Sequence, residues 1–326
     1  MNKTRSDLKN TEISWASSDP LGEALHVLHM NGVFYTRSEL TAPWGLTLPS
    51  VQDCLMFHVV TSGSGWIVVK GEEPRLLKPG QFALVPRGQG HQLLSEQGAA
   101  AIDLLDLPRE KVSERYEILR HGNGGEMTTL ICGAVDFQHP AAHHLISLLP
   151  GLMCIDTWHS PQMEWFQSTL RLMTSEADEM RPGGETMITR LADILVIQAI
   201  RSWMSDNPAA QTGWLGALQD KQIGRAILAI QREPDHEWTV ELLADEVAMS
   251  RSAFAARFTK LIGETPMKYL LNWRMNVALT WLKERELTVA ELACRLGYQS
   301  EAAFSRAFKR AIGVSPGQVS RNTDSH

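Results

Sequence analysis

The residues best suited to chemistry in this chain are basic and small side chains at helical spacing near the C-terminus. Arg306, Lys309 and Arg310 fall on one face of an expected helix, whose opposite face carries Phe304 and Phe308. Arginine can donate two parallel hydrogen bonds to a guanine edge, and both Lys and Arg can bind phosphate. Small residues on the same face allow close approach to a major groove. The pattern therefore predicts a helix that reads double-stranded DNA.

A second expected helix, about fifty residues earlier, has the same design. The two outer faces give the candidate DNA-binding residues: Arg251, Ser252, Ala255, Ala256 and Lys260 on the first helix, and Ser300, Glu301, Ala302, Ser305, Arg306, Lys309 and Arg310 on the second. The faces are unequal, because Ala256 stands where the later helix has Arg306. We expect the second helix to be the better equipped reader of bases.

These helices belong to an internal repeat. The stretch from Leu243 to Pro266 recurs from Leu292 to Pro316, with an offset of 49 residues before the turn and 50 after it. Each copy predicts helix, tight turn and helix, and the caps repeat as well: Thr239 and Thr288 for the first helices, Ser250 and Ser300 for the second. An ordinary amphipathic all-α domain would explain the helical spacing but not the duplicated turn.

One long helix is expected between the copies. Pro266 to Glu284 contains no helix breaker, which gives a rod of roughly 28 Å. Such a rod can separate two reading helices by about one turn of B-DNA, ~34 Å. One chain could then read two successive major grooves.

The rest of the chain has a different character. Short apolar runs with turn residues between them predict strands over 54–60, 65–69 and 81–85, in a sandwich or small barrel. Helical spacing follows over 163–180 and 185–204. The second of these helices is apolar over more than one face, so we expect it to be the dimerisation element.

Bulk properties limit the possible compartments and functions. A net charge of −6 argues weakly against a nucleic-acid binder, but from Lys221 onward the chain carries 15 Lys and Arg against 12 Asp and Glu. The N-terminus lacks the apolar stretch of a signal peptide, and no apolar run approaches the ~20 residues that cross a bilayer, so a cytoplasmic protein without a membrane partner is expected. Four scattered cysteines read as small hydrophobic residues. Redox sensing through Cys54 with Cys132 or Cys154 stays an alternative.

Residues from about 222 to 321 closely resemble the DNA-binding domain of the AraC/XylS family of bacterial transcription regulators. The run from Gly297 to Arg310, closed by Gly313-Val314-Ser315-Pro316, carries the family signature almost whole. The resemblance implies two helix-turn-helix subdomains joined by a helix. It also implies base contacts near the starts of both recognition helices, which fall within the candidate residues given above.

The front of the chain resembles the cupin-type sensor of one AraC subgroup. Gly80, Pro86, Gly88 and His91 match the second cupin motif, with Ser95 in place of the usual Asn. The first motif fails: only His58 is present where metal-binding cupins place two histidines and a glutamate. We therefore expect no metal, no other cofactor and no enzymatic activity. His58, Trp66 and His91 are candidate contacts for a small ligand in an apolar barrel, although both histidines could instead be satisfied core residues.

The predicted protein is multidomain, with α and β parts. It comprises a cupin-like sensing and dimerisation domain over 1–204 (barrel about 21–135, helices about 140–204), a linker over 205–220, and an all-α double helix-turn-helix domain over 221–326. We expect a ligand-responsive, sequence-specific transcription regulator. Its expected partners are promoter DNA, a small-molecule effector and a second copy of the chain, with RNA polymerase as a further candidate. The competing hypothesis is a cupin metalloenzyme fused to a DNA-binding module.

Overall fold

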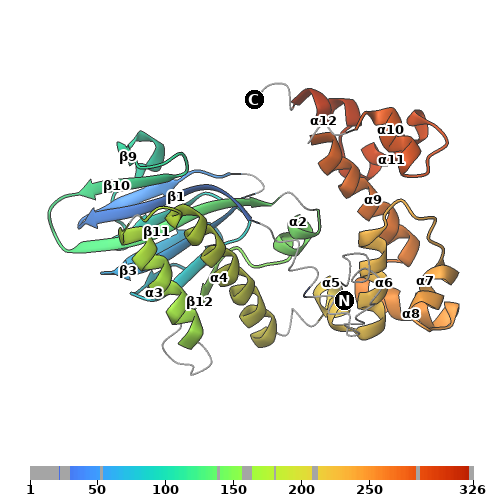
Figure 1. The fold of residues 1–326 in the computed structure, drawn as a ribbon, viewed down its shortest axis with the longest axis horizontal. Coiled ribbons are helices and arrows are strands. Elements are labelled where there is room, and N and C mark those ends of the chain that lie inside the picture. Colours follow the sequence, from blue (N-terminus) through green and yellow to red (C-terminus); the bar gives the residue numbers. More distant parts are fainter. Residues whose placement is uncertain are drawn as a thin grey trace, which may run out of the picture. The chain divides into compact units, whose positions relative to one another are not determined.

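The computed structural model describes residues 22, 30–51, 54–137, 140–155, 164–179, 181–207, 212–283 and 287–322. The chain divides into two compact units, an N-terminal unit from Ala24 to Ala210 and a C-terminal unit from Gln211 onward. Figure 1 shows strands and helices in the first and helices in the second. In the part of the chain that the structure describes, no helix has the length and apolar character needed to cross a membrane.

Two sheets form the N-terminal unit. One has the strand order β12-β6-β3-β11-β1-β10-β9 and the other the order β5-β4-β7-β2-β8, and the described strands do not close into one continuous barrel. The strands are β1 (Met30–Thr41), β2 (Gly45–Leu48), β3 (Cys54–Ser62), β4 (Gly65–Val69), β5 (Arg75–Leu77), β6 (Phe82–Val85), β7 (His91–Leu94), β8 (Ile102–Asp103), β9 (Arg109–Lys111), β10 (Tyr116–Gly122), β11 (Met127–Phe137) and β12 (Met153–Ile155). A short 3-10 helix, η1, spans Leu104–Asp106. The predicted strands over 54–60, 65–69 and 81–85 are confirmed as β3, β4 and β6.

The main core of this unit lies between the two sheets. Alternate residues of β3, such as Met56 and Val60, meet Leu46 of β2 and Ile67 of β4 there. The other face of β3 is buried too, so that seven consecutive residues from Cys54 to Val60 are inaccessible. A strand covered on both faces needs a third layer.

Helices α3 (Glu164–Glu179) and α4 (Gly184–Asp206) supply that layer on the seven-stranded sheet (Figure 1). Phe166 of α3 packs edge-on against Phe82, which stacks on Phe57 with ring centroids 5.9 Å apart. The helices predicted over 163–180 and 185–204 are confirmed within one or two residues, although Met163 and Met180 lie outside the described residues. A further helix, α2 (Pro140–Ser147), precedes β12.

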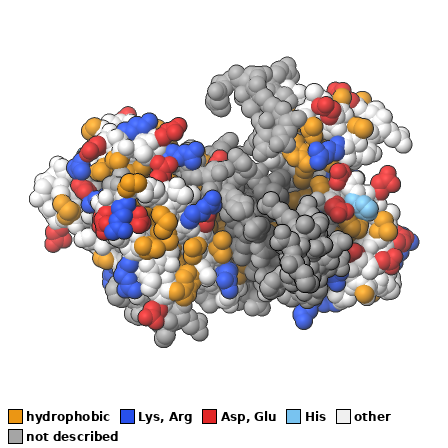
Figure 2. Space-filling view, in the orientation of Figure 1, with side chains coloured by type: hydrophobic (Ala, Val, Ile, Leu, Met, Phe, Trp, Pro, Cys, Tyr) orange, Lys and Arg blue, Asp and Glu red, His pale blue; other side chains and the backbone are white. Residues whose placement is uncertain are grey.

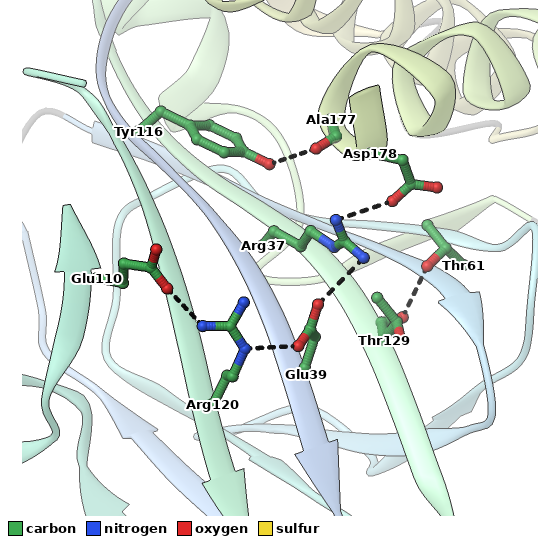
Figure 3. Close-up of polar contacts among 9 residues, drawn as sticks. All are labelled: Arg37, Glu39, Thr61, Glu110, Tyr116, Arg120, Thr129, Ala177 and Asp178. Carbon is green, nitrogen blue, oxygen red and sulfur yellow. Dashed lines mark hydrogen bonds and ion pairs between the residues drawn. The ribbon is translucent and has the colours of Figure 1, made fainter. Parts of the chain in front are cut away.

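Polar contacts fasten the end of α3 to the sheet (Figure 3). The Tyr116 hydroxyl donates to the carbonyl of Ala177 at 3.0 Å, and Arg37 forms an ion pair with Asp178 at 3.3 Å. Arg37 also contacts Glu39, which together with Glu110 flanks Arg120 on the sheet (Figure 3). Strand β1 therefore holds the helix layer through its outward residues, while Thr36 and Ser38 point to the core.

The described residues of the C-terminal unit form helices joined by short loops. Its helices are α5 (Gly213–Gln219), α6 (Lys221–Arg232), α7 (Val240–Glu246), α8 (Arg251–Ile262), α9 (Pro266–Lys283), α10 (Val289–Arg295), α11 (Glu301–Ile312) and α12 (Pro316–Asn322). Helix α5 occupies part of the segment expected to be linker, because Trp214 is buried and its indole N–H donates to the Tyr269 hydroxyl at 3.0 Å. The domain limits given above stay a prediction.

The two tight turns have the same backbone conformation. Ala248 has φ +54° and the equivalent Gly297 has φ +76°, both in the left-handed region. A side chain at this φ costs about 1–2 kcal/mol, whereas glycine has no such cost. Nothing lies within 4 Å of a Cβ built on Gly297, so the cost there would be purely conformational.

We expect Ala248→Gly to stabilise the C-terminal unit by up to about 1 kcal/mol, the relief of strain being partly offset by the greater freedom of the unfolded chain. Gly297→Ala should destabilise it by a similar amount. Urea unfolding of both variants measures the two changes. Shifts of the same sign would contradict a shared turn geometry.

Candidate nucleic-acid interface and ligand pocket

Each candidate recognition helix has a serine as its N-cap and packs into the core through two phenylalanines. Ser250 accepts from the Ala253 N–H and Ser300 from the Ala303 N–H, which confirms both predicted caps. Phe254 and Phe258, like Phe304 and Phe308 in the second copy, are fully buried. The opposite face of each helix is therefore left to solvent.

The structure places nearly all the candidate DNA-binding residues on those open faces. Ala255 and Ser305 are half-buried, and the others are exposed: Arg251, Ser252, Ala256, Lys260, Ser300, Glu301, Ala302, Arg306, Lys309 and Arg310. The faces therefore combine small residues with hydrogen-bonding groups, as direct reading of base edges requires.

The two faces differ in how their arginines are engaged. Arg251 forms an ion pair with Glu241 of α7, with 2.6 Å between guanidinium and carboxylate. Among the described residues, Arg306 has no such partner, and neither do Lys309 and Arg310. The second face thus carries three cations without an ion-pair partner in the described part of the chain, while Arg251 on the first face is engaged by Glu241.

Sequence reasoning missed Arg257, which lies on α8 among the candidate residues. Its guanidinium donates to the carboxylate of Asp220 at 2.6 Å and to the Gln222 side chain at 3.0 Å. Burial raises the pKa of Asp220, but bonds from the Ile223 N–H and from Arg257 outweigh it and leave that pKa below its usual value. Arg257 therefore anchors α8 to the start of α6. The ion pair depends on packing between helices, which the repeat does not reveal.

Helix α9 and the loop before α7 connect the two helix-turn-helix subdomains. Arg274 of α9 donates to the carbonyls of Pro234 and His236, at 2.6 and 2.8 Å. Asp235 of the same loop lies 3.8 Å from Arg295 in α10. The loop thus contacts both the connecting helix and the second subdomain, and these contacts restrain the angle between the two candidate recognition helices.

Comparison with known proteins agrees with this geometry. Residues 19–205 match the Cupin family and residues 243–322 match a helix-turn-helix domain family. A putative AraC-like transcription regulator of Streptomyces lividans is 33% identical over 93% of this chain and 98% of its own length. The chain belongs to the AraC family of transcription regulators.

Other relatives of this AraC-type regulator span both units. The HTH-type transcriptional regulator AlkR of Acinetobacter baylyi is 30% identical over 91% of this chain and 97% of its own length. Among solved structures, the DNA-binding domain of AdpA in complex with a target DNA is 29% identical, with a TM-score of 0.29, and covers 31% of this chain and 90% of its own. The two family matches and the relatives that span both units confirm a DNA-binding transcription regulator with a cupin-like domain.

In the N-terminal unit of the AraC-type regulator, the structure brings together two of the three predicted ligand contacts. The Nε2 atoms of His58 and His91 are 2.7 Å apart, and both side chains are almost completely buried. His58 lines a cavity between the sheets, whereas His91 is not among the residues that line it. Trp66 is half-buried on the other face of β4 and does not line the cavity.

The remaining cavity wall includes residues that sequence reasoning did not select. Thr36, Ser38 and Cys132 line it together with His58, and the rest of the lining is mainly apolar: Phe34, Leu46, Leu48, Met56, Leu93, Leu104, Gly133 and Ala134. About 370 Å³ of unfilled space lies within and in front of this lining, and that figure includes open solvent, so the enclosed part of the cavity is much smaller. Among the described residues, no group of three or more His, Cys, Asp or Glu is placed to hold a metal.

The strand register separates the cysteines of the redox alternative. Cys132 pairs across the sheet with His58, and Cys54 pairs with Asp136, four residues further along β11, or about 13 Å away. Cys154 lies level with His58 but two strands away from β3, so Cys54, four residues from His58 along β3, is about 16 Å from Cys154. A disulfide needs Cα atoms within ~7 Å, so none of these pairs can form one in this fold. Burial also raises the pKa of Cys132 to about 12, which keeps it a thiol.

We expect the buried histidine pair to make the stability of this unit depend on pH. Burial lowers the pKa of both residues, and the neighbouring His91 lowers that of His58 further. The unfolded chain therefore binds more protons below pH ~6.5, and stability should be constant above pH 7 and fall as pH drops below ~6.5. The slope is up to about 1.4 kcal/mol per pH unit for each proton.

Thermal unfolding of the full chain between pH 5 and 8 measures this dependence. His91→Gln should flatten the dependence, whereas His121→Gln, at a half-buried histidine of β10, should leave it unchanged. Equal slopes in the native chain and in His91→Gln would contradict the assignment.

Proposed function

We propose that one chain reads two successive major grooves on one side of promoter DNA, with α8 in one groove and α11 in the next. The observation that carries this proposal is the matched pair of capped helices, each with its phenylalanine face buried and its polar face open. Helix α9 has 18 residues, or about 27 Å of rigid rod. That length, with the width of the flanking helices, suits a separation of about one helical turn, ~34 Å.

Footprinting on DNA upstream of the protein's own gene tests the proposal. A protected stretch that spans two successive major grooves per chain is expected, and its contacts should be sensitive to salt because Lys260, Lys309 and Arg310 would bind phosphate. Protection of a single groove, or none with DNA of any sequence, would count against it.

We further propose that the N-terminal unit forms a homodimer, in which α3 and α4 pack against a second copy of the chain. Both helices expose large apolar residues at a spacing of seven: Trp165 and Leu172 on α3, and Met187 and Ile194 on α4. Figure 2 shows hydrophobic side chains gathered on this part of the surface, with Lys and Arg among them. The match to the Cupin family over residues 19–205 includes both helices.

Sedimentation of the full chain tests this interface. Ile194→Glu should shift the protein from dimer to monomer. Lys70→Glu, at an exposed position distant in sequence from α3 and α4, should not. A monomeric native protein at micromolar concentration would overturn the dimer. The AraC-type DNA-binding assignment would be unaffected.

The sensing role is proposed to operate in the cytoplasm, where promoter DNA is found. Ligand can act only if it favours one arrangement of the protein over another. Strand β1 supports such coupling, because Thr36 and Ser38 line the cavity while Arg37 and Glu39, on the other face, take part in the contacts that hold α3.

A further inference from the structure

A row of polar side chains crosses the wall of the cavity in the sensing unit. Thr36 of β1 pairs with Cys132 of β11, and Cys132 pairs with His58 of β3, so the three residues lie side by side on one sheet face. All three side chains are buried, Thr36 at 3% and His58 at 1% exposure. Polar groups buried in this way are normally hydrogen-bonded.

Hydrogen bonding to His91 fixes the tautomer of His58. The Nδ1 of His91 lies 3.0 Å from the carbonyl oxygen of Gln89, and a carbonyl can only accept, so this Nδ1 carries the proton. Burial lowers the pKa of both histidines from the ordinary value of 6.5, so both are neutral at pH 7. The Nε2 of His91 is then an acceptor, and His58 must donate to it from its own Nε2. The Nδ1 of His58 is left with a lone pair.

That lone pair has no partner among the residues that the structure describes. His58 Nδ1 and Thr36 Oγ1 are both buried polar atoms without a hydrogen-bond partner in the described protein. Leaving such an atom unsatisfied costs about 1–3 kcal/mol. An occupant that brings a donor for His58 would recover this cost.

The rest of the lining excludes charged occupants. No Asp, Glu, Lys or Arg is among the lining residues. A carboxylate, phosphate or ammonium group would be buried without a counter-ion, which is strongly unfavourable. The aliphatic and aromatic lining instead favours an apolar body.

We propose that this cavity binds a small, neutral, largely apolar molecule whose hydroxyl group donates a hydrogen bond to Nδ1 of His58. Thr36, two strands away, offers its hydroxyl to a second polar atom of the ligand or to a water beside it. Ala134, whose small side chain faces the cavity in the row of Phe34 and Met56, leaves room for the apolar body. This inference rests on the proposed sensing role.

The tautomer is tested first, in the full chain with ¹⁵N-labelled histidine. The expected spectrum shows His58 protonated on Nε2 and His91 on Nδ1. A proton on Nδ1 of His58 would overturn the inference, because that atom could then accept nothing.

Ligand chemistry is tested by calorimetric titration with three probes of similar size: phenol, toluene and benzoate. Phenol should bind at least about ten-fold more tightly than either of the others, and it should shift the Nδ1 resonance of His58. Ala134→Leu should abolish phenol binding by filling the cavity. Thr36→Val should weaken it about three- to ten-fold, while Thr129→Val, outside the cavity, should not.

Equal binding of toluene would overturn the hydroxyl requirement, tighter binding of benzoate would overturn the requirement for a neutral ligand, and no binding of any probe would overturn the site. A gel-shift measurement with promoter DNA, made on the same protein without probe, keeps the two proposals apart. Loss of DNA binding contradicts the proposed function, whereas intact DNA binding with no phenol binding contradicts only the ligand site.

Discussion

Arg306→Ala is expected to weaken binding to promoter DNA by about ten- to one-hundred-fold, and Arg251→Ala by about three-fold or less. A good bidentate contact between arginine and a base contributes about 1–3 kcal/mol of discrimination. Arg306 is exposed on α11 and has no ion-pair partner among the described residues, so its guanidinium is available. Arg251 would have to break its ion pair with Glu241 to contact a base, and the loss of that ion pair offsets part of the binding free energy gained from DNA.

Gel-shift titration with a specific and an unrelated duplex measures both losses. Arg306→Ala should lower the ratio of specific to non-specific affinity, whereas Lys309→Ala should weaken both duplexes alike and reduce the salt slope by about one. Glu241→Ala is the matched control, because it frees Arg251 and should strengthen binding slightly. Equal losses for Arg251→Ala and Arg306→Ala would contradict the unequal readers.

Phe304→Ala is expected to unfold the second helix-turn-helix subdomain selectively. Phe304 is fully buried among Phe308, Leu292 and Met275 in a core that also contains Leu282 and Val319. Removal of a phenylalanine side chain from such a core costs about 3–5 kcal/mol, which is comparable to the whole stability of a small subdomain. The footprint should shrink from two major grooves to one.

Circular dichroism and footprinting of the same variant measure these effects. Ala311→Ser, at an exposed position of α11, is the control and should keep both grooves. Phe254→Ala should remove the other half of the footprint by the same reasoning. A complete footprint with a melted α11 would show that the second copy does not read DNA.

The repeat predicted the C-terminal unit well because its signals are local. The caps Thr239 and Thr288, the serine caps and the buried phenylalanines each depend on residues three or four positions away, and all are confirmed. The expected rod over 266–284 is confirmed as α9 as far as Lys283. Helix α5 was not expected, since its reason is a contact between Trp214 and Tyr269, 55 residues apart.

The ligand pocket was predicted only in part because it depends on strand register. His58 and His91 were selected from motif positions, and their direct contact could not be read from the spacing. Thr36 and Cys132 become neighbours only through the pairing of β1 with β11, nearly a hundred residues apart. The alternation of β4 did contain a signal that Trp66 lies outside the pocket. Ile67 and Val69 are buried on one face of the strand, so Trp66, one residue before Ile67, faces the other way.

In the proposed complex, the continuous helix α9 would fix both the distance and the rotation between the two recognition helices along DNA. Each residue of an α-helix advances about 1.5 Å and turns about 100°, so one inserted residue would rotate the second reader by more than a quarter turn relative to the first. One inserted base pair between the two recognised segments turns the duplex by only about a tenth of a turn. An insertion of one residue in α9 would therefore not be compensated by an insertion of one base pair in the promoter. The loop held by Arg274 further restrains the orientation of α9. In the proposed complex, the length of α9 would therefore set the separation of the two DNA segments that one chain recognises.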